Sequence, residues 1–216
     1  MTTEHPTYPN PTVVEALCEI HFVGGAEPIW SSVRPLPLYK MIAAKFPDME
    51  IMPEANVTIE LSTDGPRQSV QPAGQRLRFT SEDGSRLIQI PSSGDVLVFN
   101  VLKPYPGWAS VKAMIVENWN SLSPVLQPQA VTRVGLRYIN KVRHSPTAPA
   151  TKNWLQPTDS IPSIVISSDA GSSSRVEAKQ GDTHRTAQTV QSLPPSPTEV
   201  YGSTVVDSDH IWMDPS

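Results

Sequence analysis

The sequence predicts an α+β fold: a mainly antiparallel sheet with two helices packed on one face, plus a weaker strand-rich C-terminal extension. Several segments alternate apolar and polar residues and are separated by turns containing proline or glycine, which is typical of antiparallel strands. Two segments instead repeat apolar residues every three or four positions, as helices do. After residue 143, proline, serine and threonine largely replace large apolar residues. We therefore expect a core domain at residues 1–143, a linker or long loop at 144–162 and a marginal strand-rich extension at 163–216.

The first strand is expected at residues 13–22, after a proline-rich entry and before a pair of glycines. Its apolar side chains fall mainly on one parity and its acidic side chains on the other, as in a half-buried strand. Cys18 belongs to the apolar parity, so we expect it to be buried packing and not a nucleophile. Because it is the only cysteine, the chain has no intramolecular disulfide and no cysteine-based zinc site.

A short helix and a further strand follow. Pro35 and Pro37 suit a first helical turn, an apolar stripe continues to Phe46, and Pro47 is expected to end the helix. Residues 56–62 alternate again and predict a strand.

A meander of three antiparallel strands is expected at about residues 76–79, 86–90 and 95–102. Asp83-Gly84 separates the first two, and glycine accepts the positive φ of a tight hairpin turn. The run at 95–102 is apolar on both parities, so both of its faces are expected to be covered.

The main helix is expected at about residues 108–122, because large apolar side chains recur there at helical spacing. They are Trp108, Val111, Met114, Ile115, Trp119 and Leu122. We expect this face to pack on the sheet, and Pro124 and Pro128 to end the helix.

Residues 132–142 show the clearest alternation, with one apolar parity and one cationic parity. We expect this strand to lie beside the one at 13–22, since each cross-strand pair of opposite charges contributes about 0.2–1 kcal/mol. The pairing sets acidic opposite basic side chains and makes them the candidate ligand-binding residues: Glu15, Glu19, Arg133 and Arg137. A structural ladder of ion pairs is the plainer interpretation of the same residues.

Alternation is weaker in the C-terminal part. A short strand is expected at residues 163–168, two weak strands at 175–179 and 183–192, and a last strand at 199–206, with no closing helix after it. Asp207, Asp209 and His210 offer metal ligands at short spacing, but a strand end and a solvated tail explain them more simply. We therefore assign no metal site.

Composition limits the classes of partner. The formal charge of −4 and the pI near 5.7 provide no basic surplus, so nucleic acid is not favoured as a partner and an anionic membrane surface is not expected. Three arginines flank the Asp-Gly turn, but neighbouring acidic residues weaken the field there: Arg76, Arg78 and Arg86. With no secretory signal and no apolar run of spanning length, the expected location is cytoplasmic.

Motifs for catalysis are not found. The sequence contains no P-loop, no GxGxxG after a strand, no nucleophile elbow and no HExxH helix. We expect no cofactor, and the sequence leaves open whether the protein is an enzyme. His21 shares the parity of Glu15 and Glu19 and would complete an acid–base trio, although a hydrogen-bonded surface histidine is the commoner case.

Three stretches resemble a family of bacterial proteins that is sporadically distributed and of unknown function. They are YPNPTVVEALCEIHF, FTSEDGSRLIQI with FNVLKPYPGW, and RVGLRYINKV, in this order and at these distances. The resemblance covers roughly the first two thirds of the chain and implies a bacterial origin without an established activity. Family members usually continue into a final helix that this chain lacks, so the resemblance also implies a truncated C-terminal part.

The expected function is that of a soluble, non-enzymatic interaction or regulatory protein with a protein partner. Two alternatives stay open. One is a metal-dependent hydrolase or nuclease-like enzyme using Glu15 and Glu19, and the other is a nucleic-acid-binding module using Arg133 and Arg137. No oligomeric state is predicted.

Overall fold

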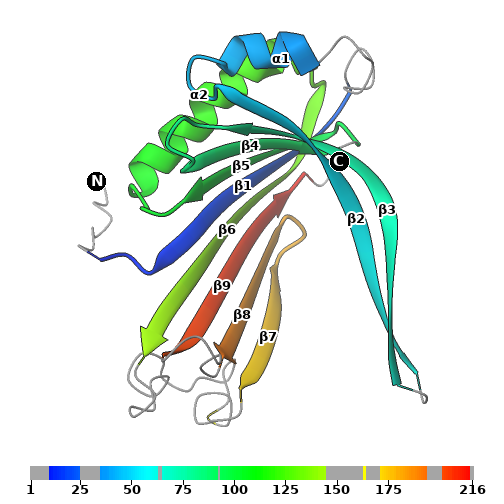
Figure 1. Ribbon diagram of the computed structural model, residues 1–216, viewed down its shortest axis with the longest axis vertical. Helices are drawn as coiled ribbons and strands as arrows, with labels where there is room; N and C mark the ends of the chain where they lie inside the picture. Colours follow the sequence, from blue (N-terminus) through cyan, green and yellow to red (C-terminus); the bar gives the residue numbers. More distant parts are fainter. Residues whose placement is uncertain are drawn as a thin grey trace.

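The structure is a computed structural model that describes residues 10–24, 35–62, 65–91, 93–144, 163, 171–193 and 201–214. Within these residues the chain forms a nine-stranded antiparallel sheet and two helices (Figure 1). The strand order is β2-β3-β4-β5-β1-β6-β9-β8-β7. The predicted α+β class with a mainly antiparallel sheet is therefore confirmed.

Strand β1 (Val13–Val23) lies in the middle of the sheet, between β5 (Val96–Leu102) and β6 (Ala130–His144). The prediction that the acidic strand lies beside the basic strand is thus confirmed. Along β1 the expected alternation is seen, with Ala16, Cys18, Ile20 and Phe22 buried. Along β6 the residues of both parities from 131 to 142 are part-buried, apart from the buried Gly135. The pairing joins segments that are more than a hundred residues apart in the sequence.

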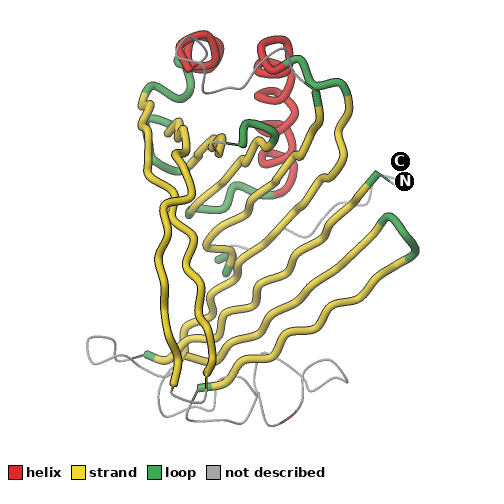
Figure 2. Tube along the Cα trace, turned by 90° about the vertical axis from the view of Figure 1, so that its right-hand side faces the viewer, coloured by secondary structure: helices red, strands yellow, loops and turns green. Residues whose placement is uncertain are grey.

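The predicted meander is formed by β3 (Gly65–Thr80), β4 (Arg86–Pro91) and β5. Gly84 in its first turn has φ 70°, a conformation that favours glycine. Strand β2 (Asp48–Ser62) begins earlier than the predicted residue 56 and pairs with β3 in a long hairpin. Figure 2 shows this hairpin running from the end of the sheet that carries the helices to the opposite end.

Helix α1 (Pro35–Ile42) starts at the predicted proline but ends before Phe46, which is nevertheless buried after a short turn. Helix α2 (Trp108–Leu126) passes through Pro124, so the prediction that this proline ends the helix is wrong. A proline in the last turn removes only one intrahelical hydrogen bond, and the extra turn buries Leu126. The helix ends at Gln127, which is left-handed (φ 51°, ψ 51°) and donates its N–H to the Ser123 carbonyl.

One cluster of buried apolar residues joins both helices to β1, β3, β4 and β5. Its largest fully buried side chains include Phe46, Phe79 and Phe99, each contributing about 1.5–3 kcal/mol by leaving water. The Trp119 ring of α2 meets Phe22 of β1 edge to face at 6.0 Å, and the Tyr39 ring of α1 stacks on Phe79 of β3 at 6.5 Å. The expected core role of the helical stripe is borne out by these contacts.

The C-terminal strands continue the same sheet. Strand β9 (Gly202–Met213) pairs with β6 along its whole length, and β8 (His184–Leu193) and β7 (Ser172–Gln180) follow in order. β9 therefore runs well past the predicted end at residue 206. The predicted strand at 163–168 and linker at 144–162 lie outside the described residues, apart from His144 and Ser163.

No helix in the described part of the chain is both long and apolar enough to span a membrane.

Candidate functional site

The four predicted residues lie on one face of two adjacent strands. In the β1–β6 register Leu17 stands opposite Arg137, Glu19 opposite Gly135 and His21 opposite Arg133. Residues that are directly paired across antiparallel strands project to the same face, and so do residues two apart along a strand. This face is the reverse of the one that carries Cys18 and Ile20 into the core.

Arg133 forms one half of the cluster. Its Nη1 donates to Glu19 Oε2 at 3.1 Å and to His21 Nε2 at 2.5 Å. A guanidinium has no acceptor, so His21 Nε2 must accept and the imidazole proton must sit on Nδ1. His21 Nε2 also lies 3.4 Å from Glu19 Oε2. Of the predicted acid–base trio, Arg133 thus joins Glu19 and His21, but not Glu15.

Arg137 does not pair with either glutamate as predicted, because Asp207 of β9 binds it from the other side. Nε donates to Asp207 Oδ1 at 2.8 Å and Nη2 to Oδ2 at 2.5 Å, a bidentate pair. These hydrogen bonds are the main reason that the pKa of Arg137 is raised. Burial of the guanidinium acts in the opposite direction and lowers it. The charges of Asp209 and Glu15 add to the rise.

Glu15 instead ends a chain of hydrogen bonds that crosses five strands. Asn100 of β5 donates from Nδ2 to Glu15 Oε1 at 2.6 Å and accepts at Oδ1 from Gln89 Nε2 at 2.8 Å. Arg76 of β3 donates from Nη1 to Gln89 Oε1 at 2.9 Å and from Nε to Glu54 Oε1 of β2 at 2.8 Å. We call these five residues the cross-strand network.

Asp207 and Asp209 extend the polar face onto β9. Burial raises the pKa of Asp209, while the positive charges of Arg133 and Arg137 oppose that rise. Asp209 stands opposite Arg137 and Asp207 opposite Ile139, whereas His210 stands opposite Leu136 on the other parity. The three residues therefore do not converge, and their placement in a solvated tail is wrong because β9 continues through them.

We call six residues of β1, β6 and β9 the charged stripe: Glu15, Glu19, Arg133, Arg137, Asp207 and Asp209. Its side chains are part-buried and still reachable, with 28% of Arg133 and 43% of Arg137 exposed. Within the residues that the structure describes, no group of three histidine, cysteine or acidic side chains is placed to hold a metal ion.

Sequence reasoning missed Asn100, Gln89 and the role of Asp207. Asn100 is 4% exposed and is the one amide in the apolar run at 95–102. A buried amide requires hydrogen-bond partners, so this asparagine among apolar residues was the available signal. Asp207 carried no such signal, because its partner depends on which strand lies beyond β6.

No protein-family model matches the chain, and no curated protein matches it either. The resemblance to the sporadically distributed bacterial family stays a prediction. Interpretation of the site thus depends on its geometry.

Proposed function

We propose that this protein is a non-enzymatic interaction or regulatory protein that binds a protein partner through the charged stripe. The observation that carries the proposal is the bidentate Arg137–Asp207 pair, which holds a half-exposed guanidinium in one orientation on an open strand face. Arginine held in place before binding loses less side-chain entropy on association and is common among residues that dominate interface energies.

The balance of charge favours a protein partner over a nucleic acid. The stripe holds four carboxylates and two guanidinium groups, and each arginine hydrogen-bonds to a carboxylate. A polyanion would meet that acidic surplus, whereas a protein surface with a surplus of lysine and arginine would be complementary to it. The partner we propose therefore presents a mixed but net basic surface.

We further propose that both helices cover the opposite face of the sheet, as the sequence predicts. Their buried side chains share the core cluster with Cys18 and Ile20, whose parity is the reverse of the stripe. A partner would then approach the stripe without displacing either helix.

The hydrolase alternative has weaker support. Glu15 accepts a hydrogen bond from Asn100 and Glu19 one from Arg133, so both carboxylates already have partners. If Mg²⁺ or Mn²⁺ raised the melting temperature of the protein, and Glu15→Ala removed that effect, the hydrolase would replace our proposal.

A charge exchange tests the proposal. The double variant Arg137→Glu/Asp207→Arg keeps an ion pair between β6 and β9 but reverses its polarity. We expect the wild-type chain to retain a partner that can be purified and re-bound, and the exchanged pair to weaken that binding at least about tenfold, as expected for a buried charge pair at an interface.

The matched control is Lys112→Glu, which reverses a charge on an exposed position of α2. It should bind as the wild type does. Equal binding by all three chains, with unchanged melting temperatures, would contradict the proposal. Binding of DNA or RNA that weakens steeply with salt would favour the nucleic-acid alternative.

A further inference from the structure

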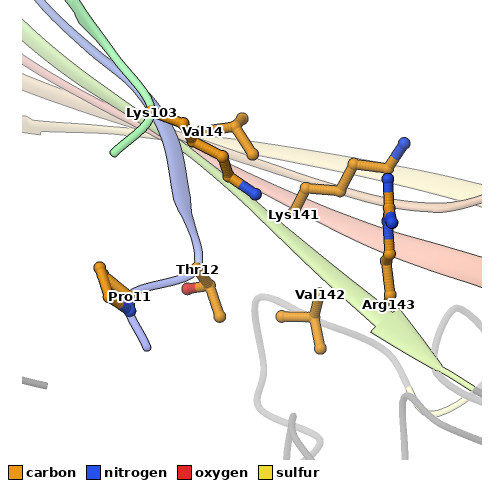
Figure 3. A pocket seen from close by; sticks show the side chains of 7 residues that line it. All are labelled: Pro11, Thr12, Val14, Lys103, Lys141, Val142 and Arg143. Carbon is orange, nitrogen blue, oxygen red and sulfur yellow. The ribbon is translucent and has the colours of Figure 1, made fainter. Parts of the chain in front are cut away.

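A pocket of about 460 Å³ lies beside the start of β1 and the end of β6, apart from the six residues of the charged stripe (Figure 3). Three short segments converge on it: residues 11–14, Lys103 just after β5, and residues 141–143 near the end of β6. The Lys141 backbone N–H donates to the Thr12 carbonyl at 2.9 Å, which fixes the entry to β1 against β6. The pocket is therefore built on the backbone of the sheet.

The charged side chains among its described lining residues are all basic. Lys103, Lys141 and Arg143 line the pocket, and none of the described residues that line it is a carboxylate. None of the three forms an ion pair with a carboxylate in the described ranges, in contrast to Arg133 and Arg137. An anion bound in the pocket would supply these cations with a counter-ion.

The remaining lining is suited to the uncharged part of a ligand. Val14, Val142 and Pro11 provide apolar surface. Thr12 Oγ1 donates its proton to Asn140 Oδ1 at 3.0 Å, so only the lone pairs of this oxygen remain for a hydrogen bond with another group. Such an oxygen accepts a hydrogen bond from a ligand hydroxyl or amino group and does not donate to an anion.

We propose that this pocket binds a phosphorylated small molecule that also carries a hydroxyl or amino group, such as a sugar phosphate or a nucleotide. Three cations suit a group with about two negative charges better than a single carboxylate, for which one arginine suffices. The volume is in the range of small-molecule pockets, about 300–1,000 Å³, and is larger than inorganic phosphate needs. No residue of the charged stripe lines this pocket, although Lys141 and Arg143 continue the parity of Arg137 along β6.

Isothermal titration of the full chain with ribose 5-phosphate, adenosine monophosphate, adenosine and malonate tests the proposal. We expect saturable one-site binding of at least one phosphorylated compound, and binding of adenosine and malonate that is about tenfold weaker or more. Lys141→Ala and Arg143→Ala should each weaken binding by about tenfold, the usual effect of losing a charge-assisted hydrogen bond.

Lys40→Ala on α1 is the matched control, because it removes an exposed lysine from an element that contributes no residue to the pocket. It should leave the affinity unchanged, and Lys141→Arg should restore most of it. Melting temperatures show whether each variant is folded. Three results would overturn the proposal: no saturable binding of phosphorylated compounds at millimolar concentration, equal binding of malonate, or binding of a short oligonucleotide alone.

Discussion

Arg137 joins β6 to β9 on the polar face of the sheet. Its guanidinium binds both oxygens of Asp207, whose side chain is only 18% exposed. Removing either partner leaves the other charge partly buried without its counter-ion. The effect of a single substitution would therefore overstate what the pair contributes to stability.

A double-mutant cycle of Arg137→Ala and Asp207→Ala measures the pair directly. We expect a coupling free energy of about 0.5–1.5 kcal/mol, because the pair is bidentate but the guanidinium is in part exposed to water. Urea unfolding of the four proteins gives the value. A coupling below about 0.3 kcal/mol would mean that the two residues act independently.

Because of Cys18, the protein is expected to become less stable at alkaline pH. Burial, aided by the negative charge of Glu19, raises the pKa of the thiol from 9.0 to about 12. The folded pKa exceeds the unfolded one, so this contribution is fully present below pH 9 and is lost as pH rises from 9 toward 12. Between pH 8 and pH 10 the loss should be about 1 kcal/mol.

Cys18→Ala tests this expectation by urea unfolding at both pH values. The variant is expected to be less stable at pH 8, since it leaves a small cavity, but to lose less stability by pH 10 than the wild type. Equal losses in the two proteins would show that the thiol does not titrate between the two states as described.

At the scale of elements, the cross-strand network connects the β2–β3 hairpin to the centre of the sheet. Asn100 joins Glu15 to Gln89 in it, with both the Nδ2 and the Oδ1 of its amide hydrogen-bonded to side chains. Asn100→Ala should destabilise the protein by about 2–3 kcal/mol, because Glu15 Oε1 and Gln89 Nε2 lose the hydrogen bonds that they form with Asn100. Val98→Ala, two residues away on the same face of β5, is the matched control. Equal losses of unfolding free energy in the two variants would show that the network contributes no more than ordinary packing does.

Elements with two distinct faces were predictable. β1 and β6 alternate so regularly that a shift of one residue would put charges into the core, which determines both the strands and their shared face. α2 was predictable from its apolar stripe, but its end was not. Whether Pro124 is tolerated depends on the burial of Leu126, a tertiary contact.

At the scale of the whole molecule, the sequence did not predict which strand lies beside β6 on the side away from β1. Arg137 and Asp207 are 70 residues apart, and no local pattern specifies that β9 adds to the sheet at this edge. The alternation of β1 and β6 therefore predicts only that Glu15 and Glu19 pair with the arginines of β6. One such pair forms, Glu19 with Arg133, while Glu15 and Arg137 have other partners.

The two halves of the sheet differ in how much apolar surface they bury. In β7, β8 and β9 the described residues include only Ala187 and Val190 as buried apolar side chains, whereas β1, β3, β4 and β5 belong to the large core cluster. We expect amides of β7 and β8 to exchange with deuterium faster than those of β1 and β5 under native conditions. Uniform protection across the nine strands would contradict this order.

Hydrogen–deuterium exchange of the full chain, free and bound to the partner isolated with it, tests the proposed function most directly. Our account predicts that binding slows exchange in peptides from β1, β6 and β9, and that the Arg137→Glu/Asp207→Arg exchange abolishes this change. Protection confined to α2 or to β7, with β1, β6 and β9 unaffected, would contradict it.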